Sequence, residues 1–167
     1  MAELSQKERL QPSLLDRLTD DDPDKLNETR EQRVLSLNKL RGCVLRDLAW
    51  LLNTGKLEAV QNLEDYPLVA HSVINYGIPD LTGTTVSSAN TFDIEQQVKQ
   101  AIWDFEPRIL HDSVRIKLSI SEQQMNHNAM AFDIEGDLWA QPLPLRLYLR
   151  TELDLETGSM EIRDRGA

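Results

Sequence analysis

The chain has 167 residues, a length that suits one domain with a real hydrophobic core. Apolar residues make up 40% and charged residues 28%, an ordinary balance for a soluble globular protein. A net charge of −10 argues against general binding to nucleic acids or anionic membranes, because both need a basic surface. The sequence has no 18-residue apolar run and no apolar signal-peptide core. Its single cysteine, Cys43, allows no internal disulfide and fits a reducing cytoplasm.

Residues 1–27 are predicted to form a polar, acidic arm, followed by a single domain over residues 28–167. One short apolar segment in the arm, residues 12–18, has the length of a single helical turn. The run Asp20–Asp24 is predicted to be a solvated loop, because clustered carboxylates repel one another and Pro23 resists helix formation. We therefore expect the arm to be weakly packed, or to be ordered by a partner.

The acidic run also has part of the spacing of a calcium-binding loop. Asp20, Asp22 and Asp24 take positions 1, 3 and 5 of an EF-hand frame, with Glu31 at position 12. That frame needs glycine at position 6 for its sharp turn, where this chain has Lys25. A solvated loop is therefore favoured over a calcium site.

Three helices are predicted in the first two thirds of the chain. The first covers residues 29–53, and its buried face is marked by apolar residues at steps of three and four: Leu37, Leu40, Val44, Leu48 and Leu51. Thr29 and Gln32 have the spacing of a capping box at its start. The second helix is predicted over residues 67–75 and the third over 92–105, with Pro107 ending the third. Residues 80–90 between them are predicted to be a flexible surface loop.

After residue 112 apolar residues recur at every second position, which is typical of strands with one buried face. The pattern covers residues 114–120, 130–138 and 143–155, and a turn at Glu156–Gly158 leads to a short strand with Met160 and Ile162. No helix lies between these strands, so the sheet is predicted to be antiparallel. The fold class is therefore α+β, with N-terminal helices packed on a small C-terminal sheet.

No sequence motif for catalysis, a metal or a cofactor is present. His71, His111 and His127 lack metal-ligand spacing, and Cys43 is interpreted as a buried, inert thiol. A glycoside hydrolase would need two carboxylates flanking a cleft, and the available candidates are Glu106, Asp133, Glu135 and Asp137. If Arg108 reaches Glu106, it favours the ionised carboxylate, which is the wrong state for a general acid. A muramidase-like hydrolase therefore remains the alternative rather than the main hypothesis.

Two features of the second half have both a structural and a functional interpretation. Glu106-Pro107-Arg108 is either a plain helix end, or a rigid turn that presents a carboxylate and a guanidinium to a partner. A small antiparallel sheet has two edges, and an edge that is not blocked can accept a strand from another chain. Pro142 and Pro144 blunt one end of the long strand, but the sequence does not rank the edges.

Five ordered segments together resemble the TssE family of type VI secretion baseplate subunits, which is homologous to the gene-25 wedge proteins of contractile-tailed phages. The resemblance covers nearly the whole chain. The segments are QPSLLDRL at 11–18, RGCVLRDLAWLLN at 41–53, YGIPD at 76–80, FEPRI at 105–109 and LWAQPLPL at 138–145.

This resemblance implies a structural protein without cofactor or turnover. It implies a fold like the strand-exchange domain of sheath proteins, a cytoplasmic place at the inner-membrane-associated baseplate, and a wedge shared with TssF, TssG and TssK. It also implies a link to the first sheath ring of TssB and TssC, and so a part in starting sheath assembly. Phage relatives have carried a lysozyme label, which the residues above do not support.

The resemblance also assigns partner contacts to particular residues. The family's Glu-Pro-Arg motif maps onto Glu106, Pro107 and Arg108, which are expected to contact the wedge core. Strand addition to the sheath is predicted near residues 143–163, with these candidates in the long strand: Leu145, Arg146, Leu147, Tyr148, Leu149 and Arg150. A third hypothesis, a generic acidic adaptor for a secreted effector, predicts effector binding without any wedge subunit.

Overall fold

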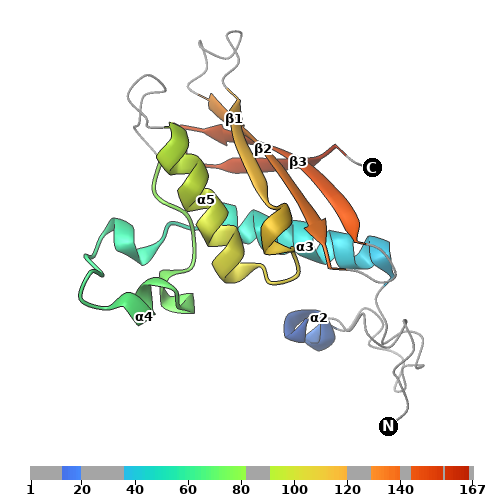
Figure 1. The fold of residues 1–167 in the computed structure, drawn as a ribbon, viewed down its shortest axis with the longest axis horizontal. Coiled ribbons are helices and arrows are strands. Elements are labelled where there is room, and N and C mark those ends of the chain that lie inside the picture. Colours follow the sequence, from blue (N-terminus) through green and yellow to red (C-terminus); the bar gives the residue numbers. More distant parts are fainter. Residues whose placement is uncertain are drawn as a thin grey trace.

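The computed structural model describes residues 13–19, 36–81, 91–119, 129–139, 144–155 and 157–165. In this part the helices precede a four-stranded antiparallel sheet, which confirms the predicted α+β class (Figure 1). Several predicted features lie outside the described residues: the Asp20–Asp24 run and its calcium frame, the Thr29–Gln32 capping box, His127, Pro142, and residues 82–90 of the predicted surface loop. No described helix is both long and apolar enough to cross a membrane.

The long helix α3 spans Leu37–Leu52. The Ser36 hydroxyl caps its start by accepting from the Lys39 N–H at 3.2 Å, and Asn53 follows its last turn. Four of the five residues predicted for its buried face are buried, namely Leu40, Val44, Leu48 and Leu51, and Cys43 and Leu52 join them. Leu37 was wrongly predicted to be buried: it is 42% exposed, because it lies in the first turn at the open end of the helix. The predicted extension back to residue 29 lies outside the described part of the chain.

The second predicted helix is wrong as a single element. The structure has α4 at Pro67–Ala70 and a separate 3-10 turn, η2, at Val73–Asn75. The chain breaks at Ser72, whose backbone is extended and whose hydroxyl accepts from the Ile74 N–H at 3.3 Å. Serine bonds to nearby backbone in this way in competition with the helix, and the segment is too short to overcome it.

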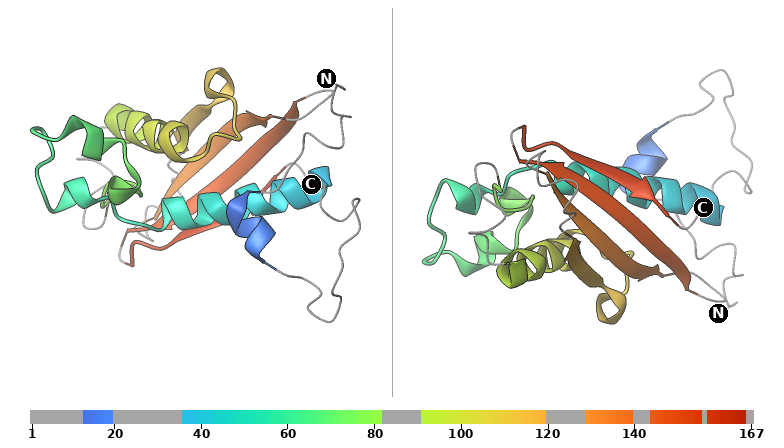
Figure 2. Two further views of the ribbon diagram at one scale, coloured as in Figure 1. Left: turned by 90° about the horizontal axis from the view of Figure 1, so that it is seen from below. Right: turned by 90° about the horizontal axis from the view of Figure 1, so that it is seen from above.

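Helix α5 spans Thr91–Phe105, in agreement with the prediction. Its buried face consists of Ile94, Val98, Ala101 and Ile102. Figures 1 and 2 show α3 and α5 on one face of the sheet, so the domain has two layers. The two helices and the inner face of the sheet share one apolar core, which includes Val44, Ile102 and Phe132.

The sheet has the order β1-β2-β3-β4, and every neighbouring pair is antiparallel. The strands span Arg115–Ser119, Ala129–Leu138, Leu145–Asp154 and Met160–Asp164. The predicted alternation holds in β3, where Leu147, Leu149, Thr151 and Leu153 are buried between more exposed neighbours. Because the order follows the sequence, β1 and β4 are the edges and β3 is an inner strand.

The remaining helical pieces are short. The 3-10 turns η1 at Leu57–Ala59 and η3 at His111–Ser113 connect larger elements. Helix α2, at Leu14–Leu18, belongs to the predicted arm, and Figure 2 shows it beside α3. Its position brings the arm next to the end of α5, where the Glu-Pro-Arg motif lies.

Candidate functional site

The motif residues Glu106, Pro107 and Arg108 form a fixed turn between α5 and the sheet. The Glu106 N–H donates to the Ile102 carbonyl at 2.9 Å, which completes the last helical turn before Pro107. The Arg108 carbonyl accepts from the Trp139 N–H at 2.8 Å, just beyond β2. The turn is therefore held at both ends by backbone hydrogen bonds, and its side chains are presented at a defined place.

Within this turn, Arg108 and Glu106 form a bidentate ion pair. The Arg108 Nε donates to Glu106 Oε1 at 2.6 Å, and Nη2 donates to Oε2 at 2.5 Å. Only 2% of Glu106 is exposed. Nη2 also reaches Asp47 Oδ2 on α3 at 2.5 Å. Burial alone would lower the pKa of Arg108, but Glu106 and Asp47 raise it above its usual range, so the guanidinium stays charged.

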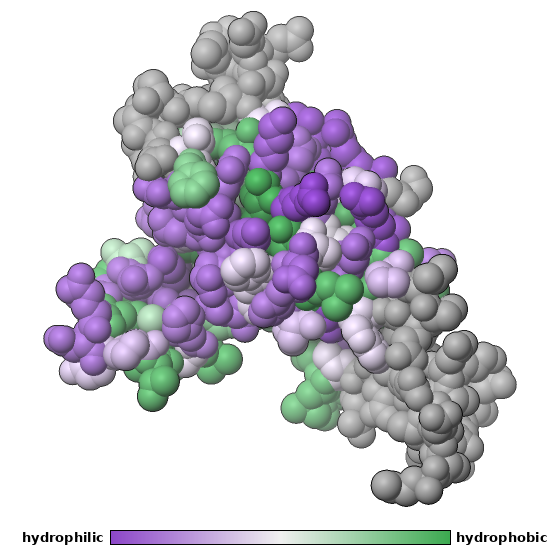
Figure 3. Space-filling view, in the orientation of Figure 1, coloured by the Kyte–Doolittle hydropathy of each residue, from purple (hydrophilic) through white to green (hydrophobic). Residues whose placement is uncertain are grey.

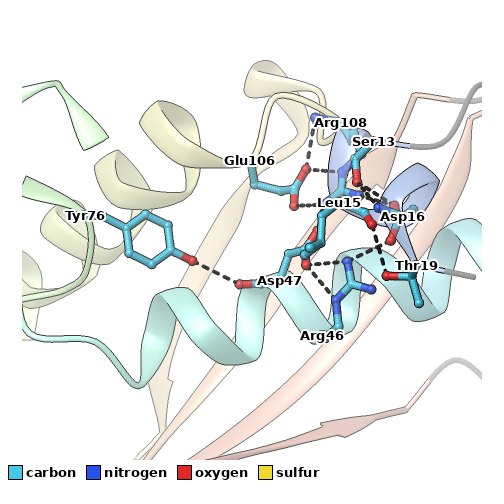
Figure 4. Close-up of polar contacts among 9 residues, drawn as sticks. All are labelled: Ser13, Leu15, Asp16, Thr19, Arg46, Asp47, Tyr76, Glu106 and Arg108. Atoms are coloured by element: carbon cyan, nitrogen blue, oxygen red, sulfur yellow. Dashed lines mark hydrogen bonds and ion pairs between the residues drawn. The ribbon is translucent and has the colours of Figure 1, made fainter. Parts of the chain in front are cut away.

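Asp16 on α2 extends this cluster to the N-terminal arm (Figure 4). Its Oδ1 accepts from Arg46 Nη2 at 2.8 Å, and its Oδ2 accepts from the Ser13 hydroxyl at 2.6 Å. The side chain of Asp16 is only 3% exposed. Burial would raise the pKa of Asp16, but hydrogen bonds from Ser13, Arg46 and Cys43 outweigh it and hold the pKa at about 2. A single carboxylate thus fastens α2 to α3.

Arg108 has one nitrogen without a hydrogen bond. Its Nη1 is buried and has no hydrogen-bond partner among the described residues. The nearest recorded acceptor is Asp16 Oδ2, at 3.9 Å, which is an ion-pair distance and too long for a hydrogen bond. A buried donor in this state is costly, and a small shift of α2 toward Arg108 would satisfy it.

Helix α2 has the carboxylate of Asp16 inside and its leucines outside. Leu14 and Leu18 are 71% and 74% exposed, and Leu15 is 43% exposed. A five-residue helix is not stable by itself, so the ion pairs of Asp16 are its main support. This arrangement leaves an apolar surface on the arm next to the motif.

A groove of about 480 Å³ opens between α2, α3 and the end of α5. Its walls are mostly apolar, and its charged groups come from the cluster just described. The lining residues are Ser13, Leu15, Asp47, Leu48, Trp50, Leu51, Tyr76, Phe105, Glu106, Pro107 and Arg108.

The motif is thus placed where α2, α3 and α5 meet. The profile of the family described as baseplate wedge protein gp25 matches residues 38–143, which is more than half of the chain and includes the motif. The chain belongs to the gp25 baseplate wedge family. This confirms the predicted resemblance at the level of the family. A search of curated proteins and a search of solved structures each gave no match.

The gp25 family is one of baseplate structural proteins, and the geometry offers little for hydrolysis. Both oxygens of Glu106 are occupied by donors from Arg108, so this carboxylate is placed as an acceptor. The other three candidates, Asp133, Glu135 and Asp137, do not line the groove. Asp133 and Glu135 lie within 3.9 Å and 3.6 Å of Arg150 and Arg146, on the neighbouring strand. Of the four predicted carboxylates, the groove therefore contains Glu106 alone among the described residues.

The predicted contact residues of β3 lie on both faces of the sheet. Leu147 and Leu149 are buried in the core, whereas Arg146 and Tyr148 are exposed on the opposite face, and Leu145 and Arg150 are intermediate. Backbone pairing joins β3 to β2 on one side and to β4 on the other, so β3 cannot accept another strand. Within the predicted range 143–163, only β4 is at an edge.

The remaining polar candidates lie apart from this cluster. His71 Nδ1 is 3.0 Å from Asp104, and the His111 ring stacks on Trp103. Over the described part of the chain, no group of three or more histidine, cysteine or acidic side chains is arranged to hold a metal.

Sequence reasoning missed four members of the cluster: Asp16, Cys43 as a hydrogen-bond partner, Arg46 and Asp47. The available signal was the adjacent pair Arg46-Asp47 within an otherwise apolar helix face. A charged pair next to buried positions predicts an interior ion-pair network, but its partners on α2 and α5 depend on the tertiary fold.

Proposed function

We propose that this chain is a wedge subunit of a type VI secretion baseplate, which links TssF and TssG to the first ring of the contractile sheath. It acts as a structural protein without turnover, in the cytoplasm at the inner-membrane-associated baseplate. The observation that carries the proposal is the gp25 family match, which spans α3, α5 and the motif turn. The geometry of the motif supports the contact with the wedge, and one open sheet edge supports the contact with the sheath.

On the wedge side, the contact surface comprises the motif turn, the groove and α2. Glu106 is buried, so its role is to fix Arg108, while Pro107 is exposed at the groove. Arg108 in turn fixes Asp47 and lies next to Asp16 of α2. The motif therefore orders the surface that TssF and TssG contact, and TssK joins the same wedge.

On the sheath side, β4 is the better edge for strand addition from TssB or TssC. The outward N–H of Leu118 on the other edge, β1, already donates to Glu95 of α5 at 2.7 Å. On β4 the outward backbone groups of Met160 are both bound by the side chain of Asn53. The Met160 N–H donates to Asn53 Oδ1 at 2.8 Å, and the Met160 carbonyl accepts from Asn53 Nδ2 at 2.9 Å. The register with β3 then turns the backbone N–H and carbonyl of Ile162 outward, and neither has a hydrogen-bond partner among the described residues. An incoming strand would pair with these groups of Ile162.

Co-purification with TssF and TssG tests the wedge contact. The wild-type chain is expected to join the complex, whereas Arg108→Ala, checked for folding, is expected to lose it. Pro107→Ser serves as a companion variant, because it changes the exposed surface and leaves the ion pairs intact. Loss with Arg108→Ala alone shows that binding depends on Arg108 and its ion pairs, and loss with both shows that the exposed surface of Pro107 contacts the partner as well. A wild-type chain that does not bind contradicts the wedge role, and a cell-wall hydrolysis assay would then be the next experiment.

Two matched proline variants test the sheath contact. Ile162 on β4 and Ile116 on β1 are both half-buried, and both have outward N–H groups, so proline removes no inter-strand bond at either site. Ile162→Pro is expected to stop sheath polymerisation on the assembled wedge, and Ile116→Pro is expected to permit it. Equal polymerisation with both variants would contradict strand addition at β4.

A further inference from the structure

Residues 55–78, here called the 55–78 loop, carry an unusual number of exposed apolar side chains. Figure 3 shows green apolar groups among purple polar ones over the part of the molecule that carries α4. Leu68, Val60 and Val73 are more than 80% exposed, and Ile74 and Tyr66 are 65% and 58% exposed. Single exposed apolar residues are ordinary, but five within fifteen residues form a candidate interaction surface.

Hydrogen bonds nevertheless give the 55–78 loop a defined structure. Its ends are joined by a parallel bridge between Gly55 and Ile78, with the Lys56 N–H donating to the Ile78 carbonyl at 2.9 Å. Inside it, Asn75 is 5% exposed and ties two parts together, donating to the Ala70 carbonyl at 2.8 Å and accepting from the Glu58 N–H at 2.9 Å. Polar contacts and the buried side chains of Leu63 and Ile78 thus hold the loop in shape, while the five exposed apolar side chains point outward.

The charge of the loop narrows the choice of partner. Lys56 pairs with Glu58 at 2.6 Å, which leaves Glu64 and Asp65 as a net charge of −2 beside Tyr66. Neither Glu64 nor Asp65 pairs with a lysine or arginine among the described residues. An anionic membrane would be repelled by this charge, and a second copy of the loop would bring the same charge against it. A basic segment with apolar side chains complements both the exposed apolar side chains of the loop and its negative charge.

We propose that the 55–78 loop is a preformed docking surface for a protein segment that is both apolar and basic. The inference rests on the proposed function, since the segment belongs to a partner in the baseplate, and it places a contact on the opposite side of the groove from α2. Because the loop is ordered beforehand, little conformational entropy is lost on binding. The apolar side chains supply affinity, and Glu64 with Asp65 selects the sign of the partner's charge.

Affinity for a co-purified TssF–TssG complex tests the surface with two double variants. Leu68→Ser with Val73→Ser removes apolar groups, and Glu64→Lys with Asp65→Lys reverses the charge. Phe92→Ser is the matched control, because Phe92 is 62% exposed on α5 outside the loop. We expect each double variant to raise Kd by about tenfold or more, as for a central contact of an interface. The charge-reversed variant should lose more at low salt than at high salt, and the control should bind like wild type.

A photo-crosslinking amino acid in place of Leu68 identifies the bound segment. The crosslinked peptide is expected to be rich in lysine or arginine and to contain large apolar residues. An acidic peptide would overturn the proposal. Loop variants that bind like wild type would also overturn the docking proposal, but they would leave the wedge role intact. A wild-type chain that does not bind the complex contradicts both. Binding to anionic vesicles, or a concentration-dependent dimer, that is lost in the Leu68/Val73 variant would assign the surface to another occupant and also overturn it.

Discussion

The sheet and the 55–78 loop differ in where they place their apolar side chains. In β3, Leu147 and Leu149 are buried against the helices, and the residues between them are exposed. In the loop, Leu68 and Val73 are exposed, while the amide of Asn75 is buried. The sheet is therefore stabilised by its apolar core, whereas the loop relies on backbone pairing and buried polar contacts besides the two buried side chains Leu63 and Ile78. This difference indicates that the sheet serves the fold and that the loop serves recognition.

The same substitution in the two regions tests this contrast most strongly. Leu147 is 1% exposed, so Leu147→Ala is expected to lower the free energy of unfolding by about 2–5 kcal/mol through lost burial and a cavity. Leu68 is 88% exposed, so Leu68→Ala should change stability by less than about 0.5 kcal/mol. Urea denaturation followed by circular dichroism measures both. A large loss from Leu68→Ala would mean that the loop belongs to the core.

The charged cluster is the second test, because it joins the helical layer to the arm without apolar burial. Arg108→Ala leaves Glu106 buried and without its cation, and removing one member of a buried pair costs about 3–5 kcal/mol. Arg163→Ala is the control, because Arg163 is 59% exposed and pairs with the surface carboxylates of Glu161 and Glu152. Thermal unfolding of the two variants gives the comparison. Similar melting temperatures would contradict a structural role for the Glu106–Arg108 pair.

The fold was largely predictable, because α3, α5 and the strands follow periodicities that a core imposes on the sequence. Leu37 to Leu51 and Val114 to Leu155 show these periods directly. The 55–78 loop was not predictable in the same way, since five of its apolar residues are exposed and mark no buried face. This is why Pro67–Asn75 was predicted to be one helix.

The candidate site was predictable only in part. Glu106, Pro107 and Arg108 could be selected from the sequence because they form a motif at a helix end. Asp16 could not, since its partners lie on another element about thirty residues away, as its bond to Arg46 shows. Which strands form the edges depends on the strand order, which periodicity alone does not determine.

The loop can be distorted without touching the sheet by changing Gly77. Its φ of 130° is unfavourable for any residue with a side chain, and an added Cβ would lie 2.3 Å from the Thr54 carbonyl oxygen. Gly77→Ala is therefore expected to open the base of the loop, at a cost of about 2 kcal/mol or more. Hydrogen exchange should increase at Lys56 and Ile78, whose amides close the base, and stay unchanged in β2 and β3. Uniformly faster exchange would show that the loop and the sheet unfold together.

Helix α2, like the 55–78 loop, buries a polar side chain and exposes apolar ones. A substitution there gives the smallest expected change in stability. Asp16→Asn removes the charge that holds α2, and should lower stability by about 1–2 kcal/mol at neutral pH, since one pKa unit corresponds to about 1.4 kcal/mol. The folded pKa of Asp16, about 2, lies below its ordinary value, so this stability is present above about pH 4 and is lost as the pH falls toward 2.

Cys43 provides a direct probe of α2. Burial, and then the neighbouring Asp16 carboxylate, raise the pKa of its thiol and slow its reaction. In Asp16→Asn the charge is gone and α2 is loosened, so a disulfide reagent at pH 8 should react faster with Cys43 than in wild type. Leu18→Ser is the control, because it alters an exposed face of α2 and keeps Asp16 in place. If both variants react at the wild-type rate, α2 is held by contacts other than the Asp16 ion pairs, and its likeness to the 55–78 loop fails.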